Sequence, residues 1–153
     1  MSVALREITA NQDNAVTRRF FAMCAEAKID VQHILYDAAD IAHLARLVAQ
    51  GDVPRDGLKT LIVLGRYTNG QTSTPTEVAA LAQRLKSALP DADWAACAFG
   101  PQETACLIET MRHGGKTRIG FENNRLNTDG QVAANNAERV TELVTQAKRA
   151  GFA

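Results

Sequence analysis

The sequence predicts an α/β protein with a parallel sheet, on the strength of two observations. Short apolar stretches of strand length alternate five times with longer stretches in which apolar residues recur at helical spacing. One strand-length stretch, residues 60–65, is apolar on both alternating faces, as a strand covered on both sides must be. Strict alternation of strands and helices implies parallel strands, because parallel neighbours need a crossover connection.

The first strand–helix unit is expected within residues 2–28. Residues 2–8 are short and mostly apolar, which predicts a strand with its charged pair near the end. Residues 13–28 predict a helix with one buried face. We expect its buried stripe to comprise Val16, Phe20, Met23, Cys24 and Ala27, and its polar back to comprise Thr17, Arg18 and Glu26.

The next two units carry the signals that begin and end helices. Residues 32–37 predict a strand, after which Asp37 or Asp40 can cap a helix that Gly51 ends. After the strand at 60–65, residues 74–77 form a capping box, with a hydroxyl N-cap, proline at the first helical position and glutamate at the third. This is the clearest helix start in the sequence.

The last two units occupy residues 94–149. Residues 94–100 predict a strand and residues 101–112 a helix with Glu103 in its first turn, and a further strand follows Gly114. Asn135 or Asn136 caps the last helix. We expect that helix to bury Val140, Leu143, Val144 and Ala147, and to expose the charges of Glu138, Arg139, Glu142, Lys148 and Arg149.

Composition suits one soluble domain over residues 1–153. The chain is 46% apolar, and its 17 acidic and 17 basic residues give zero formal charge, so no broad attraction to nucleic acid or to an anionic membrane is implied. The cysteines, Cys24, Cys97 and Cys106, lack C-x-x-C spacing and lie in apolar segments, which indicates reduced, buried thiols. No apolar run approaches the ~20 residues of a membrane span. We therefore expect a cytoplasmic location.

The stretch 114–124 is the best candidate for a functional site. Arg118 stands at the start of the predicted strand and Glu122 at its end, where binding and chemistry collect in α/β folds. A charge is costly inside a buried strand, so Glu122 is expected at the mouth where the strand meets a loop. The alternatives are structural: Arg118 could be an interior ion-pair partner, and Glu122 a loop carboxylate paired with a nearby arginine.

The number of units bears on the architecture. The strand lengths and the period resemble a (β/α)8 barrel of the TIM type, but five units are three too few for a complete one. The prediction is therefore a partial barrel of about five β/α units. An open Rossmann-like sheet is the alternative, although no Gly-x-Gly-x-x-Gly follows any predicted strand.

Several motifs resemble the C-terminal part of the β-keto acid cleavage enzymes, a family that includes 3-keto-5-aminohexanoate cleavage enzyme. They extend over nearly the whole chain, and the run R-x-G-x-E-N/D-N is the most specific. The matching segments are residues 5–7, 32–37, 63–67, 97–100, 114–115, 118–124, 129–130 and 136–137.

The resemblance implies a zinc-dependent TIM barrel that condenses a β-keto acid with acetyl-CoA. A retro-Claisen step then gives acetoacetate and a new CoA ester, which makes the enzyme both a transferase and a C–C lyase. Zinc suits this chemistry because it can polarise the keto oxygen. By resemblance Glu122 is a zinc ligand, Arg118 is the catalytic cation beside the substrate, and Asn123 and Asn124 complete the motif.

The sequence departs from the family pattern in two ways. Many members have an aspartate where this chain has Asn123, and an amide cannot act as a general base. In addition, the family's His-x-His zinc pair and first three strands have no counterpart, because the only histidines are His33, His43 and His113. His33 is expected to be a hydrogen-bonded histidine of the core or of the base of the barrel.

Cofactor and partner expectations follow from the same resemblance. Gly100 and Gln102 stand at a helix start where a CoA phosphate could bind, although simple helix capping is the alternative. Open strand edges of a partial barrel favour pairing with another chain, so we expect a homo-oligomer or a complementing barrel fragment. The remaining alternatives are a non-catalytic partial-barrel binding or assembly module and an unrelated five-stranded α/β binding protein.

Overall fold

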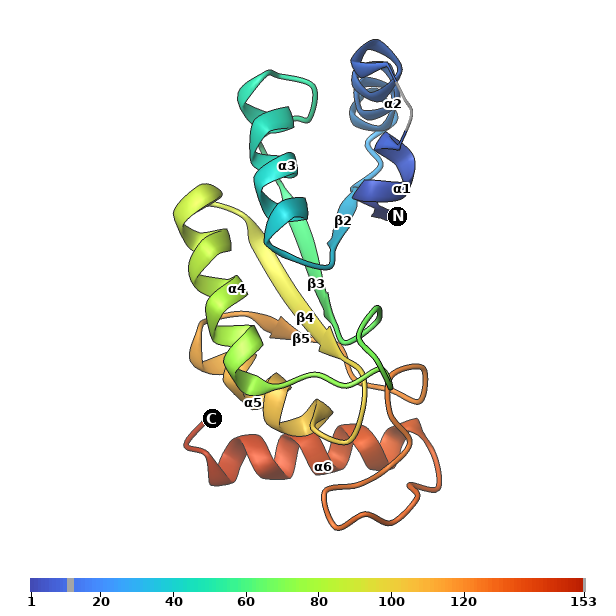
Figure 1. Ribbon diagram of the computed structural model, residues 1–153, viewed down its shortest axis with the longest axis vertical. Coiled ribbons are helices and arrows are strands. Elements are labelled where there is room, and N and C mark those ends of the chain that lie inside the picture. Colours follow the sequence, from blue (N-terminus) through green and yellow to red (C-terminus); the bar gives the residue numbers. More distant parts are fainter. Residues whose placement is uncertain (11–12, 153) are drawn as a thin grey trace. The chain divides into compact units, whose positions relative to one another are not determined.

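The fold is an α/β arrangement with five parallel strands, as the sequence predicts. The computed structural model describes residues 1–10 and 13–152. The strands, labelled in Figure 1, are β1 (Ser2–Ala4), β2 (Gln32–Leu35), β3 (Lys59–Leu64), β4 (Asp93–Ala98) and β5 (Lys116–Thr117). The helices are α1 (Leu5–Thr9), α2 (Asn14–Glu26), α3 (Ala38–Ala49), α4 (Pro75–Ala88), α5 (Glu103–Arg112) and α6 (Asn136–Arg149).

The strand order distinguishes between the two predicted architectures. The sheet runs β1-β2-β3-β4-β5, so each strand is next to the one that follows it in the chain. Val3 lies opposite His33, His33 opposite Thr60, and Ala95 opposite Lys116, all in parallel register. A doubly wound sheet reverses its strand order at a switch point, whereas a barrel does not. The order supports the partial TIM-type barrel.

Contacts divide the chain into two compact units. The first comprises residues 1–62 and 83–94, and the second comprises residues 63–82 and 95–153. Strands β3 and β4 and helix α4 each contribute residues to both units. A single domain over residues 1–153 therefore stays a prediction.

Helix caps lie close to the predicted positions. In the capping box of α4, Glu77 Oε2 accepts the Thr74 N–H at 2.7 Å, and Thr74 Oγ1 accepts the Glu77 N–H at 3.4 Å. Asp37, rather than Asp40, caps α3 by accepting the N–H groups of Ala39 and Asp40. Asn135 caps α6 by accepting the Glu138 N–H at 2.9 Å.

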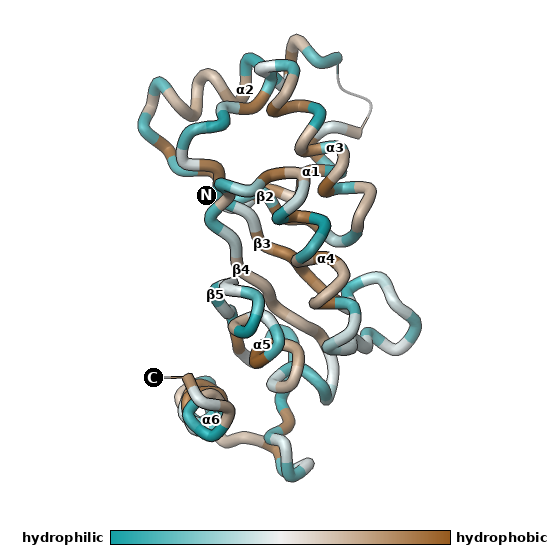
Figure 2. The backbone as a smooth tube through the Cα atoms, turned by 90° about the vertical axis from the view of Figure 1, so that its left-hand side faces the viewer, coloured by the Kyte–Doolittle hydropathy of each residue, from teal (hydrophilic) through white to brown (hydrophobic). Residues whose placement is uncertain are grey.

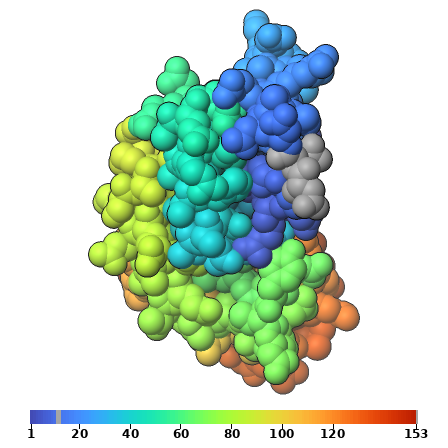
Figure 3. Space-filling model, turned by 45° about the horizontal axis from the view of Figure 1, so that its top comes forward, coloured from blue at the N-terminus to red at the C-terminus, as the bar shows by residue number. Residues whose placement is uncertain are grey.

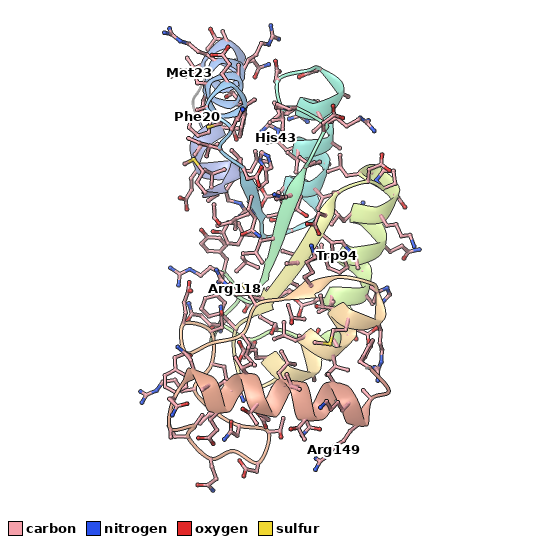
Figure 4. The ribbon with its side chains drawn as sticks, turned by 180° about the vertical axis from the view of Figure 1, so that it is seen from behind. Phe20, Met23, His43, Trp94, Arg118 and Arg149 are labelled. Carbon is pink, nitrogen blue, oxygen red and sulfur yellow. The ribbon has the colours of Figure 1, made fainter. Side chains whose placement is uncertain are left out.

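In the first unit, the predicted first strand and the predicted face of α2 both need correction. The strand ends at Ala4, and residues 5–9 form the short helix α1. On α2 the side chains of Val16 and Met23 are 53% and 57% exposed, and Figure 4 labels Met23 on this helix. Thr17, which is predicted on the polar back, is buried together with Phe21, whereas the predicted burial of Cys24 is confirmed. The helix is thus rotated by about one residue from the predicted orientation, with Phe21 as its large inward side chain packed against His33.

In the second unit, α5 and α6 pack around a small apolar core. Leu107 and Ile108 of α5 contact Leu143 and Ala147 of α6. The tube view shows α6 nearly end-on, with both hydrophobic and hydrophilic residues around its axis (Figure 2). Two predictions for α6 are wrong: Val140 and Val144 are each 47% exposed, and Arg139, which was expected to face solvent, is fully buried.

Two glycines allow residues 66–72 to pass close to the ends of β3 and β4 in the second unit. This loop is exposed and is coloured green on the surface in Figure 3. A Cβ atom on Gly65 would lie 2.9 Å from the Thr72 carbonyl oxygen, and one on Gly100 would lie 2.8 Å from that of Gln71. Both glycines also have positive φ angles, 78° and 92°. The loop then ends at the buried Ser73, whose hydroxyl donates to the Phe99 carbonyl at 2.7 Å.

The thiols match the sequence prediction. Cys24, Cys97 and Cys106 are buried and free of disulfides. Burial raises the pKa of Cys97 to about 11 and also raises the pKa of Cys106. Both thiols are therefore protonated at neutral pH.

Among the described residues, no helix combines the length and the apolar character that crossing a bilayer requires.

Candidate functional site

The segment that carries Arg118 and Glu122 is a turn rather than a continuous strand. Strand β5 ends at Thr117, although the Arg118 N–H still donates to the Ala96 carbonyl of β4 at 2.9 Å. Beyond it, the N–H groups of Asn123 and Asn124 donate to the Gly120 carbonyl at 2.9 and 3.3 Å, which closes the turn. The expectation that Glu122 ends a strand is therefore wrong, since the chain leaves the sheet before it reaches this residue.

The turn nevertheless brings the two predicted side chains together. Arg118 Nη2 lies 3.5 Å from Glu122 Oε2, and the two side chains are 43% and 72% exposed. The same nitrogen donates to Cys97 Sγ at 3.2 Å. The guanidinium, labelled at Arg118 in Figure 4, is thus held from two sides and remains partly open to solvent. A half-exposed, oriented guanidinium can bind a carboxylate or phosphate group.

The two asparagines that follow have different surroundings. Asn124 closes its own loop, because its Oδ1 accepts the Leu126 N–H and its Nδ2 donates to the Leu126 carbonyl, both at 2.9 Å. Asn123 is 7% exposed, and its carbonyl accepts the Gly100 N–H at 3.2 Å. Its Nδ2 is buried without a hydrogen-bond partner. Asn124 is a structural residue, whereas Asn123 holds an unused donor beside the turn.

A buried ion pair that the sequence analysis missed lies behind the turn. Arg139 Nη2 of α6 donates to Glu103 Oε2 of α5 at 2.9 Å, and both side chains are fully buried. Burial raises the pKa of Glu103, and the Arg139 guanidinium and the Gly120 N–H oppose that rise. The sequence did contain a signal that Arg139 is buried. Arg139 stands four residues before Leu143 and eight before Ala147, so all three lie on the same face of α6, and all three are buried.

Comparison with known families identifies the chain. A family model described as beta-keto acid cleavage enzyme matches residues 1–153. The chain belongs to the β-keto acid cleavage enzyme family. The TIM-type barrel of this family agrees with the sequential order of the five parallel strands.

The CoA contact at Gly100 and Gln102 stays a prediction, and the two residues have different surroundings. Gly100 donates its N–H to the Asn123 carbonyl at 3.2 Å, so this group is already used within the chain. Gln102 is exposed at the N-cap of α5, where it makes no side-chain capping bond. Glu103 lies in the first turn of the same helix and adds a negative charge near its N-terminus.

The metal chemistry of the β-keto acid cleavage enzymes is not matched by a complete donor set here. No group of three His, Cys, Asp or Glu side chains able to hold a metal ion occurs among residues 1–10 and 13–152. Glu122 offers one exposed carboxylate, which is paired with the Arg118 guanidinium. His43 contacts Thr9 and Arg46, and His113 contacts Glu109. The described residues alone do not fit a zinc site.

Proposed function

We propose that the chain takes part in the cleavage of a β-keto acid with acetyl-CoA, giving acetoacetate and an acyl-CoA. The family match over the whole chain supports this reaction class. The single observation that carries the proposal is the Arg118 guanidinium, which Cys97 and Glu122 orient while it stays partly exposed. A β-keto acid carries a carboxylate, and a fixed guanidinium is the side chain best suited to bind one.

Two residues of the turn, Arg118 and Asn123, have roles within this proposal. Arg118 binds the substrate carboxylate and stabilises negative charge that develops nearby. Asn123 does not act as a base, since its amide cannot accept a proton, but its free Nδ2 can donate a hydrogen bond after a small movement of the turn. A CoA phosphate would contact Gln102. Zinc dependence would require donors from outside the described residues to join Glu122.

A second candidate function is a non-catalytic partial-barrel module. The observation that favours it is the 72% exposure of Glu122, together with the lack of a three-donor metal cluster in the described part of the chain. Metal analysis separates the two candidates. Zinc near one equivalent per active unit supports the enzyme, whereas no zinc together with no turnover of several β-keto acids supports the module.

We predict that Arg118→Ala lowers kcat/KM in an acetyl-CoA-dependent β-keto acid assay by roughly 100-fold or more, because the fixed charge is lost. Arg118→Lys should recover little of that loss, since an ammonium cannot form the same paired hydrogen bonds. Arg149→Ala, which removes an exposed arginine of α6, is the matched control and should leave the rate unchanged. Undiminished turnover by Arg118→Ala would remove this residue from the mechanism.

We also predict a dimer or a larger oligomer, or capture of a complementing barrel fragment. Apolar side chains are exposed on α2 at Val16 and Met23 in the first unit. In the second unit a groove of about 490 Å³ is lined largely by apolar side chains, including Met111, Ile119, Val140, Val144 and Phe152. Exposed apolar surface of this kind marks interaction sites. Sedimentation velocity at micromolar protein should show a species larger than the 16.5 kDa monomer, and a purely monomeric profile would contradict the prediction.

A further inference from the structure

We infer that the Glu103–Arg139 pair is a positioning device that fixes the turn between Arg118 and Glu122. The significance of this device for catalysis rests on the proposed function. Its effect on the turn does not, because that effect can be measured without turnover.

The contacts form a continuous connection from α6 to the turn. Glu103 Oε2 accepts from Arg139, and its other oxygen, Oε1, accepts the Gly120 N–H at 3.4 Å. Gly120 stands two residues after Arg118 and two before Glu122, so holding its amide limits the motion of both side chains. No other side chain accepts a hydrogen bond from the Gly120 N–H among the bonds of the described residues.

The arginine is itself held in place from several directions. Its Nη2 also donates to Thr104 Oγ1 at 3.2 Å, and its Nη1 donates to Asn127 Oδ1 at 3.1 Å and to a carboxylate oxygen of Glu142. These partners come from α5, from the loop after the turn and from α6. These bonds hold both terminal nitrogens of the guanidinium, and Glu103 is held with them.

A second anchor of the turn comes from the start of α6. Asn136 Oδ1 accepts the Phe121 N–H at 2.9 Å. The same oxygen would lie 3.2 Å from a Cβ atom on Gly120, so the absence of a side chain there allows the close approach. Two successive amides, those of Gly120 and Phe121, are thus bound by side chains from two different helices.

A contribution to the stability of the fold does not by itself explain why this position holds a buried ion pair. Taking two full charges out of water is costly, and well-packed apolar residues of similar volume can replace a buried ion pair without loss of stability. An apolar pair, however, offers no acceptor for the Gly120 N–H. What the charged pair supplies and an apolar pair does not is a fixed carboxylate oxygen at the turn.

The test is the double variant Glu103→Leu/Arg139→Met, which replaces the ion pair by apolar side chains of similar volume. We expect its melting temperature to stay within a few degrees of that of the unsubstituted protein. Amide hydrogen exchange at Gly120 and Phe121 should become at least tenfold faster. In the β-keto acid assay kcat should fall at least tenfold, a loss that an unchanged melting temperature separates from unfolding.

Two further variants keep the result interpretable. Glu103→Gln keeps the shape of the side chain and one of its oxygens, so amide exchange at Gly120 should become faster by less than in the double variant. If the double variant does not fold, Glu103→Gln takes its place in the test. Glu142→Gln alters a partner of Arg139 that does not touch the turn, and it should leave exchange at Gly120 unchanged.

The outcomes separate the inference from the proposed function. Exchange at Gly120 that stays the same in Glu103→Leu/Arg139→Met and in Glu103→Gln overturns the inference, whatever the activity. Faster exchange supports it. A lack of turnover by the unsubstituted protein counts against the proposed function alone.

Discussion

Arg139→Ala should lower the free energy of unfolding by about 3–5 kcal/mol, because it leaves the fully buried Glu103 carboxylate without its counter-charge. The measurement is urea denaturation at pH 7.5, with the double variant Glu103→Leu/Arg139→Met as the comparison that removes both charges. Arg149→Ala on the same helix is exposed and should change the free energy by less than about 0.5 kcal/mol.

The loss of stability caused by Arg139→Ala should also depend on pH, and it should be smaller at acid pH. Burial already raises the pKa of Glu103, and removal of the guanidinium should raise it further. As the pH falls, the unpaired carboxylate takes up a proton and the penalty for burying its charge disappears. The difference in stability between this variant and the unsubstituted protein should therefore shrink toward acid pH, and a pH-independent loss below about 1 kcal/mol would contradict our account of the pair.

The second large effect is expected at His33, whose protonation should destabilise the fold. The side chain is 2% exposed and packs on Phe21, with ring centroids 5.1 Å apart, and burial lowers its pKa from 6.5 to about 4. Because the folded pKa is depressed, the neutral imidazole contributes its full stability above pH 6.5, and that contribution is lost as the pH falls toward 4. Between pH 7.5 and pH 5.0 the loss should be about 2 kcal/mol.

The variant His33→Phe isolates this effect from the titration of other groups. Its ring keeps an aromatic contact with Phe21 and has no site for a proton, and His33 Nδ1 makes no hydrogen bond that would be lost. Denaturation of both proteins at pH 7.5 and pH 5.0 should show a smaller decrease for the variant, by about 2 kcal/mol. Parallel pH profiles for His33→Phe and the unsubstituted protein would exclude the burial effect.

Local signals predicted the elements of this fold because they act within a few residues. The Thr74–Glu77 capping box and the Asp37 cap satisfy N–H groups that lie two or three positions away, so their geometry is contained in the sequence itself. The contact between Arg118 and Glu122 has the same local character, as the two residues are four positions apart.

The orientation of the amphipathic helices was harder to predict. On α2, the set Val16, Phe20 and Met23 has the same spacing as the set Thr17, Phe21 and Cys24, and only the second is inward. The spacing of apolar residues limits the buried face of a helix to a broad range of orientations. Contacts with residues distant in the sequence determine which orientation the helix takes. On α6 the inward position 139 is an arginine, which hydropathy assigns to solvent.

The buried Glu103–Arg139 pair also depends on contacts between residues distant in the sequence, so the sequence did not predict it. Glu103 and Arg139 are 36 residues apart, and each is unfavourable in the interior without the other. Their burial depends on the packing of α5 against α6, which no local pattern encodes. Likewise, the Gly120 amide beyond strand β5 donates to the Glu103 carboxylate, a partner 17 residues earlier in the chain that no local pattern indicates.

The two close glycines beside the loop of residues 66–72 limit how this chain can vary. A methyl group at Gly65 or Gly100 would collide with a carbonyl oxygen at 2.9 or 2.8 Å, in a backbone conformation that already disfavours side chains. Gly57 and Gly130 also have positive φ angles, but a Cβ atom there would meet nothing within 4 Å. In a randomised library selected for folded protein, asparagine should be tolerated at Gly57 and Gly130, whereas only glycine should survive at Gly65 and Gly100.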